Sequence, residues 1–185
     1  MSVMIAGLAM FLGVHLVPTV PGVRAGLLMR LGERRYRGLF ALVAAPGLAL
    51  IVAGCVMRPE SVQVFAPLPA ARAAAPALVT IAFVLFAAAN MRTHIRRTVR
   101  HPMLIGLMLW SGVHLLANGD LAGTILFGSF LIYSIVALVS AAHRNTAKIF
   151  VPESKHDLIA IAAGVAISFL AIYFHPTLFG TAPVA

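Results

Sequence analysis

Six apolar runs of roughly helix length constrain this chain more than any other feature. They lie between charged or proline-rich breaks, near residues 2–17, 38–57, 73–91, 102–117, 121–142 and 158–174. A helix needs roughly 17 to 25 residues to cross ~30 Å of hydrocarbon, so the shortest runs need an upright helix or a thinner bilayer. Hydrophobic residues make up 61% of the chain and charged residues 10%, unlike a soluble protein. The sequence therefore predicts an all-α fold, a polytopic membrane helix bundle of about six transmembrane helices, with residues 1–185 as a single transmembrane domain.

Short local signals predict how these helices begin, bend and end. Pro46-Gly47 lies inside the second run and predicts a kink there. In Asn118-Gly119-Asp120, Gly119 can take the left-handed position after one helix while Asp120 caps the next. The fourth and fifth helices are therefore expected to be antiparallel neighbours.

Basic residues alternate between the two sides of the predicted bundle. Two of the 14 Lys and Arg residues, Arg58 and Arg72, fall on one side. The others are Arg24, Arg30, Arg34, Arg35, Arg37, Arg92, Arg96, Arg97, Arg100, Arg144, Lys148 and Lys155. The positive-inside rule places this second set in the cytoplasm and both termini outside. The net charge of +9 then reflects topology and contact with membrane lipids, and it does not indicate a surface for nucleic acid.

The segment from Ala25 to Tyr36 is amphipathic and is expected to lie on the cytoplasmic membrane surface. Glu33 and Arg37 are four residues apart, which predicts an ion pair on the surface of a helix. The first apolar run has no basic segment before it and no small-residue cleavage site after it. It is therefore expected to be a retained helix and not a signal peptide.

Two of the seven histidines, His15 and His114, stand inside apolar runs. An ionisable ring in hydrocarbon needs a partner, so it is a candidate for function. Each ring can be hydrogen-bonded to a carbonyl across the bundle, or the two rings can share one ligand. Because the chain has five acidic residues and one cysteine, Cys55, a zinc or di-iron site is not indicated. A haem with two imidazole ligands fits better, since the porphyrin supplies the other four nitrogen donors.

The remaining five histidines lie outside the apolar runs. His94, His143 and His156 fall in or beside basic segments and are expected to contact solvent or lipid headgroups. His175 precedes a proline at the outer end of the sixth run and is interpreted as an interfacial cap. His101 can cap the fourth helix or have a function, but thirteen residues separate it from the intramembrane histidine of that run, ~20 Å along a helix. One metal cannot bridge that separation.

Helical periodicity places Trp110, Ser111 and Asn118 near His114 on one face of the fourth helix. Such a stripe can line a flat cofactor. Alternatively, Trp110 belongs to the interfacial aromatic belt and Asn118 only caps the helix.

The carboxylates of a haem need charged partners, and the basic segment before the fourth helix can supply them. Arg97 or Arg100 is therefore predicted to meet a haem propionate at the cytoplasmic interface. The predicted cofactor-binding residues are together His15, His114, Trp110, Ser111, Asn118, Arg97 and Arg100, with His15 and His114 as the iron ligands.

Several short motifs in combination resemble the NnrU family of bacterial membrane proteins. They are LGERRYRGLF at residues 31–40, Arg100-His101-Pro102, Trp110 with His114, Asn118-Gly119-Asp120 and Leu126-Phe127-Gly128, and they cover about the first 145 residues. The family is similar to plant and cyanobacterial zeta-carotene isomerase, a haem b membrane enzyme, and is associated with denitrification genes in some bacteria. The resemblance implies the bacterial inner membrane, haem b, and His15 and His114 as iron ligands.

The resemblance implies a haem-dependent cis-trans isomerase of a long apolar, carotenoid-like substrate that enters from lipid, with no catalytic residue indicated. The isomerase branch has a cysteine where this chain has Ser111, and a hydroxyl is a poor iron ligand, so chemistry that needs a thiolate is not expected here. A second hypothesis is a non-enzymatic accessory protein of denitrification that responds to nitric oxide or to an unidentified redox partner. A third is a haem-free membrane scaffold in which both histidines are hydrogen-bonded.

Overall fold

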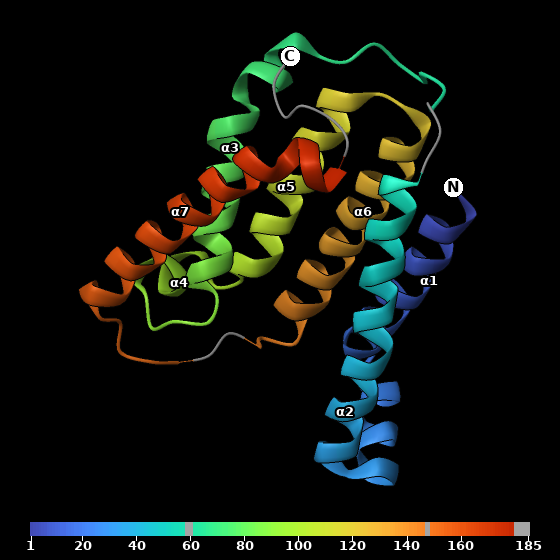
Figure 1. Ribbon diagram of the computed structural model, residues 1–185. Helices are drawn as coiled ribbons and strands as arrows, with labels where there is room; N and C mark the ends of the chain where they lie inside the picture. Colours follow the sequence, from blue (N-terminus) through green and yellow to red (C-terminus); the bar gives the residue numbers. More distant parts are fainter. Residues whose placement is uncertain (58–60, 147–148, 180–185) are drawn as a thin grey trace. The chain divides into compact units, whose positions relative to one another are not determined.

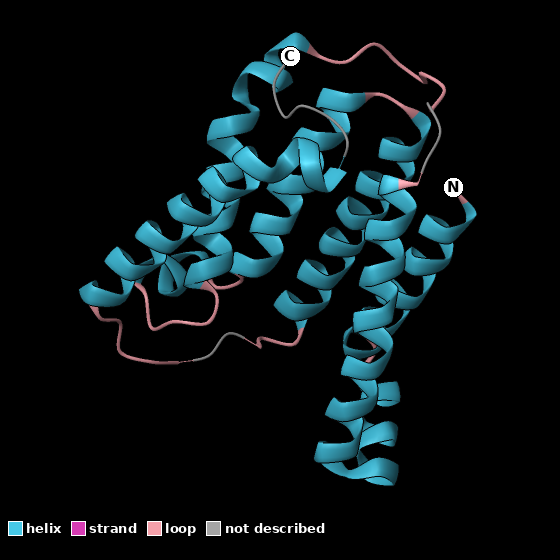
Figure 2. Cartoon of the chain, viewed as in Figure 1, coloured by secondary structure: helices cyan, strands magenta, loops and turns pink. Residues whose placement is uncertain are grey.

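The computed structural model describes residues 1–57, 61–146 and 149–179. Within these residues the regular structure is helical, apart from one isolated bridge between Gln63 and Asp120 (Figure 2). The elements in Figure 1 are α1 (Ser2–Leu16), the 3-10 helix η1 (Val17–Thr19), α2 (Pro21–Val56), α3 (Pro69–Ala88), α4 (His94–Val99), α5 (Pro102–Asn118), α6 (Leu121–His143) and α7 (Ser154–Phe179). The predicted all-α fold is confirmed. Arg58 and Lys148, which entered the charge pattern, lie outside the described residues.

Five segments of the described chain are long and apolar enough to cross a membrane. They are α1 continued by η1, α2, α3, α6 and α7. The remaining predicted run forms α5, which has 17 residues and therefore rises only ~25 Å. Each of the six apolar runs thus contributes a helix to an all-α membrane bundle.

The chain folds as two compact units, Met1–Ser61 and Val62–Ala185. Unit 1 contains α1, η1 and α2, and unit 2 contains the helices from α3 to α7. The single domain over residues 1–185 stays a prediction.

In unit 1, α1 packs along α2 through glycines that bring the two backbones together (Figure 1). A Cβ atom added to Gly47 would lie 2.8 Å from the backbone nitrogen of Phe11, and one added to Gly54 would lie 2.5 Å from that of Met4. Contacts this short do not occur between real side chains, so the crossing requires residues without a Cβ. Close backbone approach at small residues is a common way for membrane helices to associate.

The second run is part of a longer element, because α2 begins at Pro21 and is interrupted at Gly32. This glycine has φ 72° and ψ 161°, angles that only glycine adopts readily, and the chain turns back there to form a helical hairpin (Figure 1). Pro46 lies inside the helical part of α2 that follows Gly32, and the kink predicted there stays a prediction.

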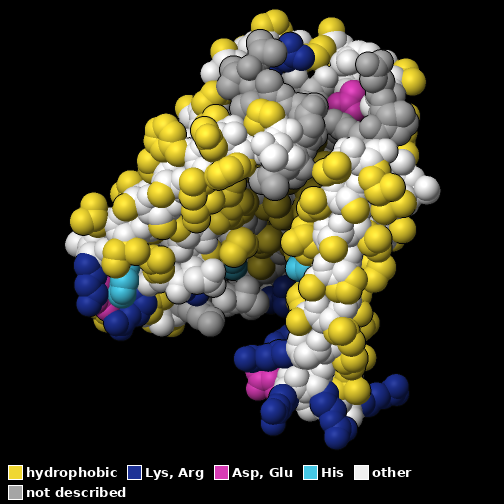
Figure 3. Space-filling model, in the orientation of Figure 1, with side chains coloured by type: hydrophobic (Ala, Val, Ile, Leu, Met, Phe, Trp, Pro, Cys, Tyr) yellow, Lys and Arg dark blue, Asp and Glu magenta, His cyan; other side chains and the backbone are white. Residues whose placement is uncertain are grey.

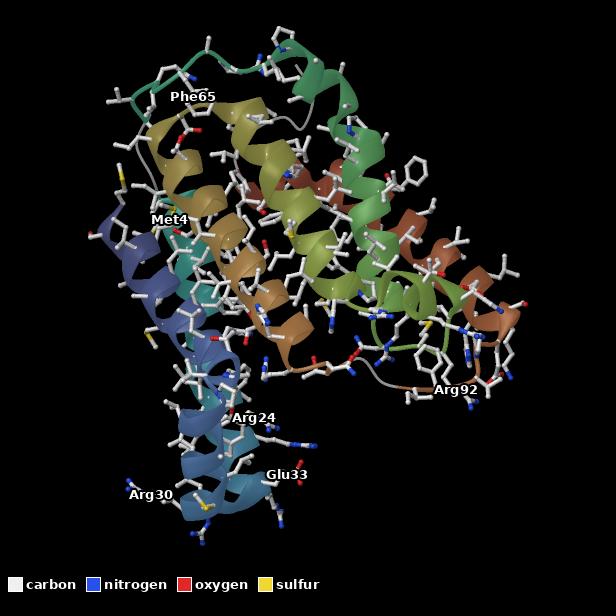
Figure 4. The ribbon with its side chains drawn as sticks, turned by 180° about the vertical axis from the view of Figure 1, so that it is seen from behind. Met4, Arg24, Arg30, Glu33, Phe65 and Arg92 are labelled. Carbon is white, nitrogen blue, oxygen red and sulfur yellow. The ribbon has the colours of Figure 1, made fainter. Side chains whose placement is uncertain are left out.

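The segment predicted to lie on the membrane surface forms the tip of this hairpin. Figure 4 labels Arg24, Arg30 and Glu33 there, and Figure 3 shows Lys and Arg side chains gathered at the same place. The predicted surface ion pair is confirmed: Arg37 donates to Glu33 at 2.5 Å. The hairpin tip therefore carries the basic residues of unit 1 outside its apolar part.

In unit 2, α3 contacts both α5 and α7. A Cβ on Gly106 of α5 would lie 2.9 Å from the ring of Phe86, and one on Gly164 of α7 would lie 2.5 Å from the backbone of Val84. The hydroxyl groups of Thr80 and Ser168 share a hydrogen bond of 2.7 Å between α3 and α7. Small residues and one polar pair thus hold the three helices together.

The predicted connection between α5 and α6 is confirmed. Gly119 has φ 73° in the left-handed region after α5, and the Asp120 carboxylate accepts a hydrogen bond of 2.9 Å from the Gly123 backbone at the start of α6. The two helices contact each other along their length, as expected for antiparallel neighbours.

The extended segment between Val62 and Leu68 covers the carboxyl end of α5. The backbone nitrogens of Val64 and Phe65 donate to the Gly119 carbonyl at 2.9 and 3.1 Å, and the Arg72 guanidinium donates to the Ala117 carbonyl at 3.0 Å. These donors satisfy carbonyl groups that a helix end leaves without partners. Arg72 thus binds the carboxyl end of α5, where its positive charge interacts favourably with the helix dipole.

At the other end of unit 2, the segment before α4 is joined to the start of α7 by ion pairs. Glu153 pairs with Arg92 and, at 2.7 Å, with Lys155, while the His94 ring contacts Asp157 at 2.6 Å. The hydrogen bond from Lys155 and the nearby charges, Arg92 foremost, lower the pKa of Glu153 below its ordinary value. His94 is exposed, and its ring also contacts the Asp157 carboxylate beside these ion pairs.

Candidate functional site

His15 lies near the end of α1, half-buried among aromatic rings of unit 1. Its Nδ1 atom is 2.6 Å from the carbonyl oxygen of Phe11, one helical turn earlier. The Phe11 ring lies 4.1 Å from the imidazole between centroids, and the Phe40 ring of α2 lies 4.8 Å away in an edge-on arrangement. These contacts fix the position of the imidazole along the helix and the tilt of its ring.

His114 has the same arrangement in unit 2. Its Nδ1 atom lies 2.8 Å from the carbonyl oxygen of Trp110, again one turn earlier. The ring centroids of Trp110 and Phe127 lie 5.1 and 4.8 Å from the imidazole, and Phe130 of α6 packs edge-on against the Trp110 indole. Aromatic residues of α5 and α6 therefore hold this histidine in place.

The shared backbone contact determines the tautomer of both imidazoles. A carbonyl oxygen only accepts hydrogen bonds, so Nδ1 carries the proton in His15 and in His114. In the neutral ring the lone pair then lies on Nε2, which is the tautomer that binds a metal through that nitrogen. The same local hydrogen bond thus gives both histidines the same tautomer.

The other two polar residues predicted to lie on this face of α5 bond to its own backbone. The buried Ser111 hydroxyl donates to the Leu107 carbonyl at 2.6 Å. The Asn118 amide donates to the His114 carbonyl at 2.7 Å, so it braces the turn that follows the histidine. A role of either residue in cofactor binding stays a prediction.

Arg97 and Arg100, the predicted propionate partners, are exposed in and just after α4. Arg100 has φ 61° and ψ −48°, and the backbone nitrogen of His101 donates to the Val99 carbonyl at 2.7 Å. This is a γ-turn of the rare, strained kind. Next to it, burial foremost and the Arg100 charge second lower the pKa of His101, which favours the neutral ring.

The strain at Arg100 leads to a prediction about two matched variants. Arg100→Gly should raise the free energy of unfolding by ~1 kcal/mol, because glycine adopts this conformation without a clash of its Cβ. Arg100→Ala keeps the Cβ and should leave the strain in place, although both variants lose the guanidinium. Thermal unfolding of the purified proteins in detergent compares them, and equal melting temperatures for the two variants would contradict the prediction.

The structure also places residues at the site that were not predicted to belong there. His175 of α7 lies within electrostatic reach of His114, although its sequence position indicated only an interfacial cap. Tyr36 and Phe40 extend the aromatic contacts of His15, and their four-residue spacing in the LGERRYRGLF motif was the available signal. His175 had no such signal, because its proximity depends on how α7 packs in unit 2.

Comparison with protein families decides which family this is. A family model described as NnrU protein matches residues 3–183. The chain belongs to the NnrU family. The match covers nearly the whole chain and so extends past residue 145, where the motif resemblance ended. No similar curated protein and no similar solved structure was found.

Within the described part of this NnrU protein, no three His, Cys, Asp or Glu side chains form a group able to hold a metal ion. His15 belongs to unit 1, whereas His114 and the other predicted site residues belong to unit 2. Both imidazole tautomers fit axial ligation of a haem, which needs a single nitrogen from each residue.

Proposed function

We propose that this NnrU protein binds haem b, with His15 and His114 as its axial ligands. The observation that carries the proposal is the repeated tautomer: each Nδ1 donates to the carbonyl four residues earlier, at 2.6 and 2.8 Å. A polar ring in an apolar helix costs free energy unless its nitrogen atoms have hydrogen-bond or metal partners. Iron coordination uses the remaining lone pair of each ring.

The neighbouring residues have defined roles in this proposal. Trp110 and Phe127 restrict rotation of the His114 ring, and Asn118 braces its helical turn, so the nitrogen is held in position before the cofactor binds. Arg97 or Arg100 provides a positive charge for a propionate. When bound, haem b would supply a redox-active iron within the membrane.

The proposed activity is cis-trans isomerisation of a long apolar, carotenoid-like substrate that reaches the haem from lipid. Its basis is the family resemblance and the location of both histidines on apolar helices. The alternative is a redox or nitric-oxide-responsive accessory protein of denitrification. Ser111 favours this alternative, because its hydroxyl stands where the isomerase branch has a cysteine and already donates to the Leu107 carbonyl.

The visible spectrum of the purified protein tests the proposal. Protein from a haem-replete host should show a low-spin b-type spectrum, and a pyridine haemochrome assay should give about one haem per chain. Nitric oxide binding to the reduced form would favour the accessory role, and conversion of a cis carotenoid in liposomes would favour the isomerase. A folded, colourless protein would support the haem-free scaffold and refute haem binding.

We propose further that the protein lies in the bacterial inner membrane with both termini in the periplasm. Within unit 2, Figure 4 shows Phe65 and Arg92 at opposite ends. The ion pairs of Arg92 and Lys155 with Glu153 lie at the Arg92 end. The positive-inside rule then assigns that end to the cytoplasm. Alkaline phosphatase should be active when fused to the carboxyl terminus and inactive when fused at residue 97. The reverse pattern would mean that the protein has the opposite orientation in the membrane.

A further inference from the structure

The hydroxyl group of Tyr36 is a buried polar atom of unit 1 that the proposed function does not use. It is inaccessible to solvent and has no hydrogen-bond partner among the described residues. Leaving a buried hydroxyl without a partner costs about 1 to 3 kcal/mol. A phenylalanine would fill the same space without that cost, so the hydroxyl indicates an acceptor that is supplied from elsewhere.

Aromatic contacts connect Tyr36 to the proposed ligand. The Tyr36 ring lies 6.5 Å from the Phe40 ring, and the Phe40 ring lies 4.8 Å from the His15 imidazole. Because Tyr36 and Phe40 are one turn apart on α2, the tyrosine lies on the side of His15 that leads to the basic hairpin tip. A group bound there would lie between the imidazole and the arginines.

The charges nearby indicate an anionic acceptor. Glu33 is the only acidic residue of unit 1 in the described chain, and its carboxylate is paired with Arg37. Arg34 and Arg35 are exposed and form no ion pair with any described residue. A hydroxyl donor near uncompensated guanidinium groups suits a carboxylate, and no described residue provides one to Tyr36.

We propose that Tyr36 donates a hydrogen bond to a propionate carboxylate of the haem that His15 ligates. The inference rests on the proposed function, since it assigns part of the cofactor to a residue of unit 1. Haem b carries two propionates, and the inference assigns one of them to Tyr36. This carboxylate then lies toward the basic hairpin tip of unit 1, where its charge is compensated.

Tyr36→Phe tests this assignment because its effect should change sign with the cofactor. In haem-free protein from a haem-deficient host, the variant should unfold at a higher temperature than the wild type, since an unpaired buried hydroxyl is removed. In haem-loaded protein, haem transfer to apomyoglobin should be about tenfold to hundredfold faster, as expected for loss of a hydrogen bond to a charged group. A purely structural hydroxyl would instead lower the stability of both forms.

Haem dimethyl ester identifies the acceptor, because its propionates are neutral. The difference in release rate between wild type and Tyr36→Phe should be smaller with the ester than with ordinary haem, because an ester carbonyl accepts only a weaker, neutral hydrogen bond. The exposed Tyr173→Phe should match the wild type with either cofactor. Equal release of ordinary haem from wild type and Tyr36→Phe would overturn the inference while leaving haem binding intact. An undiminished difference with the ester would mean that the hydroxyl does not bind a charged propionate, and it would also overturn the inference. A wild type without haem would refute the proposed function itself.

Discussion

His15→Ala and His114→Ala should each lower the haem content of the purified protein by at least about tenfold, as expected when a ligand to the iron is lost. Each substitution removes one axial nitrogen and leaves a cavity beside the iron. Free imidazole should enter this cavity and restore part of the low-spin spectrum without any change in the helix backbone. The measurement is the ratio of haem to polypeptide, with and without added imidazole.

His143→Ala is the matched control, since this exposed histidine ends α6 in a basic segment. Its spectrum should equal that of the wild type. His175→Ala is more informative, because His175 lies within electrostatic reach of His114 but is not proposed as a ligand. If His114→Ala kept an unaltered spectrum while His101→Ala or His175→Ala lost it, the proposed ligand pair would be wrong.

Gly47→Ala should destabilise unit 1 by about 1 to 3 kcal/mol, the usual cost of overpacking. The added Cβ would lie 2.8 Å from the backbone nitrogen of Phe11, so α1 and α2 must separate to admit it. Since Phe11 accepts the His15 hydrogen bond, the same movement should weaken haem binding. Thermal unfolding followed by circular dichroism in detergent measures the first effect, and haem retention measures the second.

Gly38→Ala is the control for this prediction, because it lies on the same helix and a Cβ there meets no atom within 4 Å. It should stabilise the protein by about 0.5 to 1 kcal/mol, since alanine is the better helix former. The two variants make the same chemical change with opposite expected signs. Equal stability of both would mean that α1 and α2 do not meet at Gly47.

Features that depend on neighbouring residues in the chain could be predicted from the sequence. The turn at Gly119 and Asp120 is one such feature, because the left-handed glycine and the capping carboxylate act within a few residues of each other. The ion pair between Glu33 and Arg37 is another, since one helical turn joins them. The six apolar runs became helices for a similar reason: backbone groups in hydrocarbon must bond within their own segment.

The position of the break in α2 required the structure. Pro46 predicts a kink inside this helix, but such a signal says nothing of a turn at another position of the chain. Gly32 gave a weaker local signal and became the turn, because the conformation at φ 72° and ψ 161° is open only to glycine.

Partners that are distant in the sequence could not be predicted for a related reason. The contact of His94 with Asp157 spans 63 residues, and the bond from Arg72 to Ala117 spans 45. No local pattern encodes such pairs, because they depend on which helix faces pack together.

For the candidate site, the sequence by itself determined which histidines lie in apolar helices, since that follows from composition along the chain. The tertiary structure decided what surrounds them: Phe40 beside His15, and Phe127 beside His114. The orientation of each ring combines both levels, because the Nδ1 bond to the preceding turn is local while the aromatic contacts come from another helix or helix segment. The unpaired Tyr36 hydroxyl belongs to the tertiary structure alone, since burial of an atom is a property of the packed helices and not of the sequence pattern.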